Sequence, residues 1–196
     1  MYLVIELNKQ DIFKTELSYI KDSDIKESLS IMIDTIPDYF FHIPASSTGK
    51  YHPSYATGDG GLLRHTKVVV RMAEELFGIY KFPTHTKDLI IMACLLHDTI
   101  KKGFEEEKYT RFDHPLLAAE NIRNHAKELK LSKDDIEFVC GCIESHMGRF
   151  NTSEYSDIVL PIPQTPEQKF VHMCDYLGAR KVIDIHFDKE NNIIEV

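Results

Sequence analysis

An uncharged run near the middle of the chain ends abruptly in a histidine and an aspartate. Residues 89–96 contain no charged residue, glycine or proline, and His97 and Asp98 follow directly. A run of this length favours a buried helix over a strand. Imidazole and carboxylate are the ligands that divalent metals take most readily when no thiol is offered. The pair alone has two interpretations: a metal site, or a core histidine beside a surface aspartate at a helix end.

The composition is that of an ordinary globular protein with an acidic balance. The chain has 196 residues, of which 43% are hydrophobic and 28% charged, so we expect one domain with a substantial core. The formal net charge is −8. Long nucleic acid is therefore an improbable partner, because phosphate neutralisation supplies most non-specific affinity. A local basic pocket for one nucleotide is still compatible with this charge.

The cysteines and the N-terminus indicate a reducing compartment. The four cysteines lie in apolar contexts without a CxxC pair, which favours buried free thiols over a disulfide framework or a zinc ribbon; they are Cys94, Cys140, Cys142 and Cys174. The first residues lack the basic region of a signal peptide. No apolar run approaches the ~20 residues that span a membrane. We therefore expect a cytoplasmic protein without a membrane partner.

Hydrophobic periodicity predicts an all-α, mainly helical domain. Residues 1–7 alternate weakly and could form a short strand, and the tail could form a small C-terminal β-hairpin. Helices are expected, in chain order, within residues 10–36 (one or two, ended by Pro37), at about 62–77, 84–97 and 114–129, after Ser132, and at about 165–182. Together these elements predict a single domain over residues 1–196, with its core at about 37–182 and the hairpin tail at 183–196.

Local signals mark several helix ends. Gly78 should close the helix that contains His65. Asp113 is a plausible N-cap, with Pro115 in the following first turn. Ser132 should cap the next helix, with Asp135 at the capping-box offset.

The segment before the first of these helices is long and irregular. Residues 37–61 are rich in glycine, proline and serine, and loops of this length in a compact domain are usually functional or disordered. Aromatic residues and histidines in the segment, including Tyr51, His52 and Tyr55, argue against disorder. They could form a wall for a nucleobase, although such aromatics more often only pack the loop down.

Polar side chains recur on the inward side of the predicted helices. Each is on an inward stripe or at a core-facing helix end: His65, His97 with Asp98, His114, His146 and Asp175. A buried polar group without a partner costs about 1–3 kcal/mol, so this many inward groups must satisfy one another. A shared cation would do that. Asp175 is the most telling, because a lone carboxylate on an apolar helix face must be neutralised or paired.

With this ordered set the chain resembles the HD-domain metal-dependent phosphohydrolases over about residues 41–180. The motif is His65, His97-Asp98 and Asp175, with His114 and His146 as the additional histidines of dinuclear members. The resemblance implies one ion held by the first four residues, or two ions bridged by Asp98. The ions would be divalent transition metals (Mn, Fe, Co, Ni or Zn), which suit imidazole and oxygen ligands better than Mg.

Two local stretches resemble HD-type 3′-5′ exoribonucleases more narrowly. They are the approach to the first histidine, which includes 43–45, 51–52 and 60–66, and the run 145–148 with its continuation through Pro163, 165–167, His172 and 175–176. Those nucleases carry an N-terminal OB-type domain, which nothing in residues 1–36 could form. The likeness therefore favours metal-dependent phosphoester chemistry over RNA as the substrate.

Candidate catalytic and phosphate-binding residues surround the motif. Asp98 is expected to serve the chemistry as well as the metal, and Lys101 and Arg149 are the main phosphate contacts. Lys101 could equally be a solvated lysine at a helix end. Arg64 and Lys50 are weaker phosphate candidates, and His52 could line the pocket or extend the metal shell. Histidines expected to be structural or at the surface are His42, His85, His125, His172 and His186, with His172 slightly favoured among them by the resemblance.

Three functional hypotheses follow. The first is a phosphohydrolase, either a monoesterase or a diesterase, acting on a nucleotide, a dinucleotide or another small phosphoester. The second is a 3′-5′ exonuclease on short oligonucleotides. The third is a non-catalytic, metal-stabilised binding module, which the complete ligand set disfavours. A homo-oligomer is possible in each case.

Overall fold

The chain folds into a bundle of helices in the computed structural model, which describes residues 8–47, 52–183 and 185–194. Its α-helices are α1 (Lys9–Ile12), α2 (Lys14–Tyr19), α3 (Ser23–Asp34), α4 (Gly61–Leu76), α5 (Thr84–Leu96), α6 (His114–Asn124), α7 (Lys133–Glu144) and α8 (Pro166–Gly178). Short 3-10 helices are η1 (Asp38–Phe41), η2 (Ser54–Ala56) and η3 (Gly148–Phe150). The all-α prediction is confirmed. The strand predicted over 1–7 lies outside the described residues.

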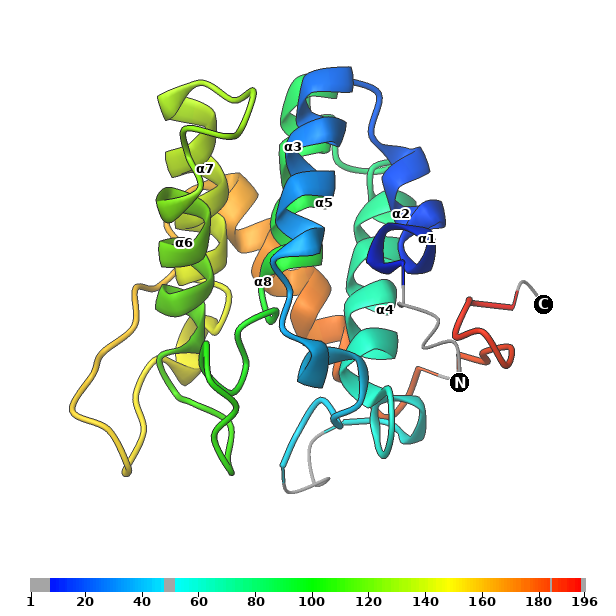
Figure 1. Cartoon of the computed structure of the whole chain (residues 1–196), viewed down its shortest axis with the longest axis vertical. Helices are drawn as coiled ribbons and strands as arrows, with labels where there is room; N and C mark the ends of the chain where they lie inside the picture. Colours follow the sequence, from blue (N-terminus) through cyan, green and yellow to red (C-terminus); the bar gives the residue numbers. More distant parts are fainter. Residues whose placement is uncertain (1–7, 48–51, 184, 195–196) are drawn as a thin grey trace, which may run out of the picture.

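Helix α5 is the central member of the bundle. It packs against α3, α4, α7 and α8, and Figure 1 shows it between the α6–α7 pair and α4. Every residue from Leu89 to Leu96 is buried, which explains why this stretch is apolar on all sides. The chain that leaves α5 therefore emerges in the interior, and His97 and Asp98 are buried there.

Two of the predicted helix-end signals are confirmed. Ser132 and Asp135 form the predicted capping box of α7, and Pro115 lies in the first turn of α6. The Asp113 cap is wrong: its carboxylate makes no capping bond and instead accepts two hydrogen bonds, of 2.8 and 2.7 Å, from the Arg111 guanidinium. A bidentate charged pair is a stronger partner for a carboxylate than a backbone N–H.

Two helices end earlier than their periodicity predicts. Helix α8 ends at Gly178 rather than near Val182, because the Tyr55 hydroxyl donates to the Gly178 carbonyl at 2.6 Å. Helix α6 ends at Asn124 rather than near Leu129. There the His125 backbone N–H donates to the Asn121 carbonyl at 3.3 Å, and the ring Nδ1 of the same residue lies 2.8 Å from that carbonyl.

The tail forms a tight turn, and the predicted β-hairpin is reduced to one antiparallel bridge between Phe187 and Ile193. No strand is formed in the described part of the tail. Its polar residues bind α4 instead: Asn191 Oδ1 accepts from Arg64 at 2.7 Å, and Asn192 Oδ1 accepts from Lys67 at 3.2 Å. Side-chain contacts with α4 thus replace most of the expected strand pairing.

The long connections gather at one end of the bundle. In Figure 1 the segments after α3, after α5 and after α7 all extend below the helices. Two of these segments meet where the Ser47 and Thr110 hydroxyls lie 2.9 Å apart. Of the helices in the described residues, none has both the length and the apolar character needed to cross a membrane.

Candidate metal centre

The six predicted ligands lie on different helices or at their ends, and their side chains cluster in the interior of the bundle. His65 lies in α4, His97 caps α5 with Asp98 next in the chain, His114 begins α6, His146 follows α7, and Asp175 lies in α8. The four histidines and Asp98 are almost completely buried, and the Asp175 side chain is 19% exposed. The helices that form the core therefore also set the positions of these side chains.

The Asp98 carboxylate lies between two pairs of histidines and turns one oxygen toward each. Its Oδ2 is 3.4 Å from His97 Nε2 and 4.0 Å from His65 Nε2. Its Oδ1 is 2.9 Å from His114 Nε2 and 3.6 Å from His146 Nε2. His65, His97 and Asp98 form the first triad, and Asp98, His114 and His146 form the second. Within each triad the possible ligand atoms all lie within 4.8 Å of one another. The two triads share Asp98, which is the arrangement expected of a bridging ligand.

Asp175 stands beside the first triad. Its Oδ1 is 2.9 Å from His65 Nε2 and 3.6 Å from His97 Nε2. A second carboxylate thus faces the same two imidazoles as Asp98. An ion in the first triad would be within reach of two histidines and two carboxylates, the set predicted for a single metal.

Backbone carbonyls orient three of the imidazoles. The Nδ1 atoms of His97, His114 and His146 lie 2.7, 2.7 and 2.8 Å from the carbonyl oxygens of Cys94, Arg111 and Ile143. In each pair Nδ1–H donates, so the neutral ring keeps its lone pair on Nε2, the atom that faces Asp98. This is the tautomer that a metal-ligating histidine requires.

The inward atoms are left without partners by the protein. His97 Nε2, His114 Nε2, His146 Nε2 and Asp98 Oδ1 are buried and form no hydrogen bond among the described residues. His114 Nε2 lies 2.9 Å from Asp98 Oδ1, but with the proton on Nδ1 both atoms are acceptors. Each such atom costs about 1–3 kcal/mol unless something satisfies it. A cation in each triad satisfies all four atoms at once. The residues present therefore fit one or two divalent transition metals.

The charges of the metal-free site are strongly coupled. Burial opposes the charged form of His97, but the Asp98 and Asp175 carboxylates raise its pKa to about 10. Burial likewise opposes the Asp98 carboxylate, yet Lys101 and His97 hold its pKa well below the ordinary value. Burial lowers the pKa of His146 to about 3. The ligands thus differ in whether they must lose a proton before a metal binds.

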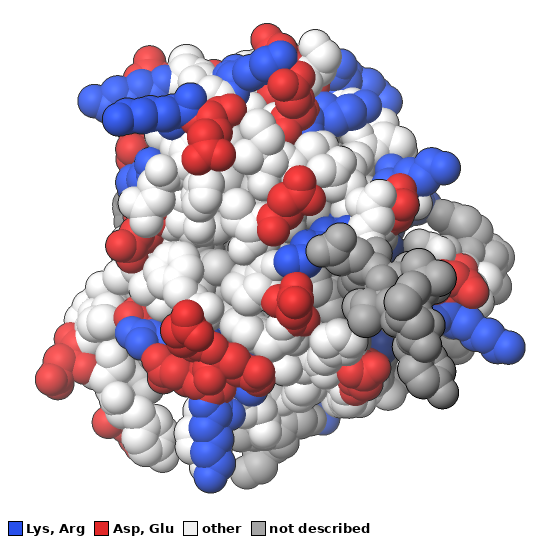
Figure 2. All heavy atoms as spheres, in the orientation of Figure 1, with Lys and Arg blue, Asp and Glu red and all other residues white. Residues whose placement is uncertain are grey.

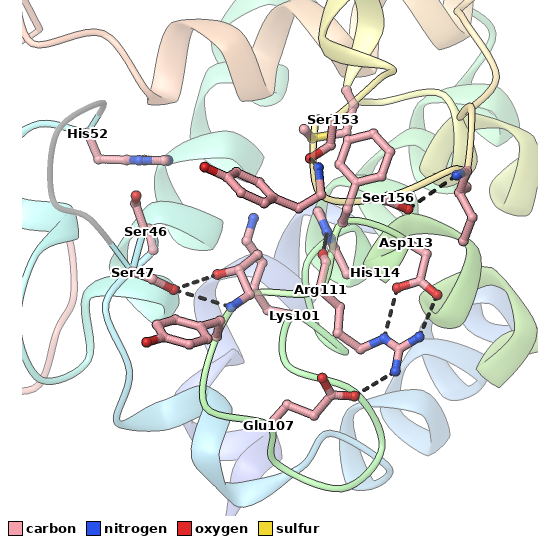
Figure 3. A pocket seen from close by; sticks show the side chains of 17 residues that line it. Ser46, Ser47, His52, Lys101, Glu107, Arg111, Asp113, His114, Ser153 and Ser156 are labelled. Atoms are coloured by element: carbon pink, nitrogen blue, oxygen red, sulfur yellow. Dashed lines mark hydrogen bonds and ion pairs between the residues drawn. The ribbon is translucent and has the colours of Figure 1, made fainter.

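An open cleft of about 1000 Å³ reaches the second triad. His114 and Lys101 line it together with His52, and Figure 3 shows His52 and His114 entering from different sides. Lys101 Nζ is 2.6 Å from Asp98 Oδ2. The cleft therefore gives a solvent-borne ligand access to the charged groups around Asp98.

The cleft is lined partly by the segment 37–61, through Ala45, Ser46, Ser47 and His52, and partly by loops that the sequence motifs did not mark. They are formed by residues 107–114 and 153–158, and they include the exposed aromatic side chains of Tyr109 and Tyr155. From the sequence, only the aromatic residues of the 37–61 segment were candidates for a wall of the site. The aromatic residues within the charged stretch after Lys102 could have indicated a second wall, because charged loops seldom need them for packing.

The other predicted phosphate contacts are placed less favourably. Arg149 is exposed, lies 4.9 Å from the Phe150 ring centroid, and is not among the described residues that line the cleft. Arg64 is bonded to the carbonyls of Tyr55, Thr57 and Asp59. Lys50 lies outside the described residues. The phosphate role of Lys101 keeps geometric support, and that of Arg149 stays a prediction without it.

Comparison with known protein families agrees with this geometry. Residues 62–180 match the sequence model of the HD domain. The chain belongs to the HD domain family. No curated protein and no solved structure matches it. The HD domain match includes all six clustered residues and supports the general class of metal-dependent hydrolases. It does not extend to the exoribonucleases in particular, so that likeness stays a prediction.

Proposed function

We propose that this HD-domain protein is a metal-dependent phosphohydrolase acting on a nucleotide, a dinucleotide or another small phosphoester. The observation that carries the proposal is the carboxylate of Asp98, which turns one oxygen to each of two histidine pairs. One member of these pairs, His114, lines an open cleft. Divalent metal held by these residues would supply Lewis-acid chemistry, namely the activation of a water and the stabilisation of the leaving oxygen of a phosphoester.

The protein's own residues would bind and orient the substrate. Lys101 Nζ lies in the cleft beside Asp98, where its charge can attract a phosphate oxygen. The backbone directly after Lys101 is held by Tyr39, whose hydroxyl donates to the Gly103 carbonyl at 2.7 Å and accepts from the Lys102 N–H at 3.1 Å. The ammonium group is therefore positioned by the fold before the substrate binds.

The charges around the cleft support a small substrate. Arg111, the second cation lining the cleft, is already paired with Glu107 at 2.6 Å and with Asp113 at 2.7 Å (Figure 3). On the face in Figure 2, basic and acidic side chains alternate among the described residues without a continuous basic stripe. A polynucleotide track needs such a stripe, whereas one phosphate needs only the metals and Lys101.

The test is turnover of a substrate panel by the full chain loaded with Mn²⁺, Fe²⁺, Co²⁺, Ni²⁺ or Zn²⁺ in turn. Nucleoside mono-, di- and triphosphates, linear and cyclic dinucleotides and simple phosphomonoesters are compared by released phosphate or mononucleotide. We expect activity with at least one class, abolished by chelator and by Asp98→Ala. Full activity of Asp98→Ala in metal-supplemented buffer would reject the proposal.

The exonuclease alternative retains one argument, the likeness of the stretches around His65 and His146 to HD-type exoribonucleases. A length series of RNA and DNA oligonucleotides distinguishes the two functions. Stepwise shortening from the 3′ end, faster than hydrolysis of any mononucleotide or dinucleotide, would favour the exonuclease. A protein that binds metal but turns over neither set would instead be a metal-stabilised binding module.

A further inference from the structure

His52 is not one of the six clustered residues, but its ring contacts the ring of His65, which is. Its ring centroid is 5.0 Å from that of His65, and the two rings meet edge to face at 88°. His52 also lines the cleft with Lys101 and His114. It therefore lies where the first triad and the cleft adjoin.

The His52 imidazole has no hydrogen-bond partner among the described residues. Its Nδ1 is buried without a hydrogen bond, and no hydrogen bond to Nε2 is formed among the described residues either. The other histidines at the site differ, because His97, His114 and His146 each use Nδ1 to bind a backbone carbonyl. A buried ring nitrogen without a hydrogen bond is costly unless a ligand completes it.

The described chain on either side of the loop that carries His52 is fixed to the scaffold. The Ala45 N–H donates to the Ala56 carbonyl at 3.0 Å, and the Leu62 N–H donates to the Ile43 carbonyl at 2.9 Å. Gly61 allows this close contact, because a Cβ at that position would overlap the Ala56 carbonyl. His52 is thus held over the centre by backbone hydrogen bonds on both sides of the loop.

We propose that His52 is a substrate-binding residue whose ring N–H donates to a phosphoryl oxygen held between Lys101 and the metal centre. The inference rests on the proposed phosphoester chemistry. The neutral imidazole of His52 would supply a directional hydrogen-bond donor without adding charge. The ammonium group of Lys101 would supply positive charge with little directional preference. Lys101 and His52 would then contact different oxygens of one phosphate.

The role differs from that of a seventh metal ligand. A ligand would contribute to metal stoichiometry and affinity, whereas a phosphate donor would change only the binding of the anion. The two possibilities are therefore separated by measuring metal and phosphate independently of turnover.

The experiment compares wild type with His52→Ala, His52→Gln and the control His42→Ala, each as the metal-loaded full chain. His42 precedes the same loop, and its side chain is 68% exposed. Metal content is measured by elemental analysis, and inorganic phosphate binding by calorimetry. We expect unchanged metal content in all four proteins and phosphate binding about tenfold weaker in His52→Ala, the loss expected for one hydrogen bond to a charged group. His52→Gln, which keeps an N–H donor, should recover part of the affinity, and His42→Ala should match wild type.

Other outcomes overturn the inference in distinguishable ways. Equal phosphate affinity in wild type and His52→Ala would reject the role of His52 and leave the proposed function intact. Loss of a metal ion in His52→Ala would show a metal ligand instead. A metal-loaded wild type that neither binds phosphate nor hydrolyses any member of the substrate panel would reject both proposals.

Discussion

At the scale of single residues, the site depends on atoms that the protein itself does not satisfy. The Asp98 carboxylate has histidines on both sides, and Lys101 Nζ lies 2.6 Å from one of its oxygens. In the metal-free protein this lysine and the proton on His97 compensate the buried carboxylates. A metal must therefore displace charge that is already present, which makes its binding dependent on pH.

Metal binding should release close to one proton at neutral pH. With a pKa of about 10, His97 is protonated in the metal-free protein, whereas His146, with a pKa of about 3, is already neutral. Because the metal takes only the deprotonated ring, affinity should rise with pH until His97 titrates near 10. Calorimetry in buffers of different ionisation enthalpy measures the number released. Release of no proton at pH 7 would contradict the assignment.

The shifted pKa values of Asp98 and His97 also predict how the stability of the metal-free protein depends on pH. The folded-state pKa of Asp98 lies below its unfolded value, so its contribution is present above about pH 4 and is lost as the pH falls further. His97 has the opposite sign: its contribution is complete below about pH 6.5 and is lost as the pH rises through about 10. Melting temperature of chelator-treated protein across this range should fall at both ends. A profile flat above pH 8 would contradict the state of His97.

Lys101→Ala should weaken the handling of phosphate without changing metal content. Loss of one charge-assisted contact to a phosphate corresponds to about a 10- to 100-fold fall in kcat/KM. The neighbouring variant Lys102→Ala is the control, because Lys102 Nζ is paired with Glu106 at 2.6 Å. Equal kcat/KM in the two variants would show that Lys101 is only a structural lysine.

At the scale of helices and loops, three of the six clustered residues lie where helices begin or end. His97 caps α5, His114 begins α6, and His146 follows α7. The segment after α7 is fixed by a further histidine, because the Nδ1 of His172 in α8 lies 2.6 Å from the His146 carbonyl. The position of His146 is thus tied to two helices at once.

Gly148→Ala should disturb this junction. Gly148 has φ +57°, and a Cβ there would overlap the His172 ring. Backbone strain should cost about 1 kcal/mol, and the overlap a further ~1–3 kcal/mol, with weaker metal binding in the triad that contains His146. Gly58→Ala is the matched control, since its φ is +68° and a Cβ would meet nothing within 4 Å. Denaturant unfolding and metal titration separate the two effects; equal loss in both variants would rule out the contact with His172.

At the scale of the whole molecule, the metal centre and the core are one structure. Helices α4, α5, α7 and α8 pack together and also carry or immediately precede His65, His97, His146 and Asp175. The free energy of metal binding should therefore appear as free energy of folding.

Removing metal should lower the melting temperature. At a free metal concentration of about 100 times Kd, binding stabilises the fold by about 2.7 kcal/mol, or roughly 5–10 °C for a chain of this size. Differential scanning calorimetry with and without chelator measures the shift, and Asp98→Ala should show almost none. An unchanged melt after complete removal of metal would place any bound ion outside the bundle.

The sequence alone determined the helices, the buried character of α5 and the identity of the clustered side chains. These follow from local periodicity and from the cost of burying unpaired polar groups, both of which are visible in the order of residues. Tertiary structure decided the rest. The hydroxyl of Tyr55, more than a hundred positions away in the chain, donates to the Gly178 carbonyl where α8 ends. The division of Asp98 between two histidine pairs, and the position of His52 beside them, also depend on contacts between distant segments, which no local pattern encodes.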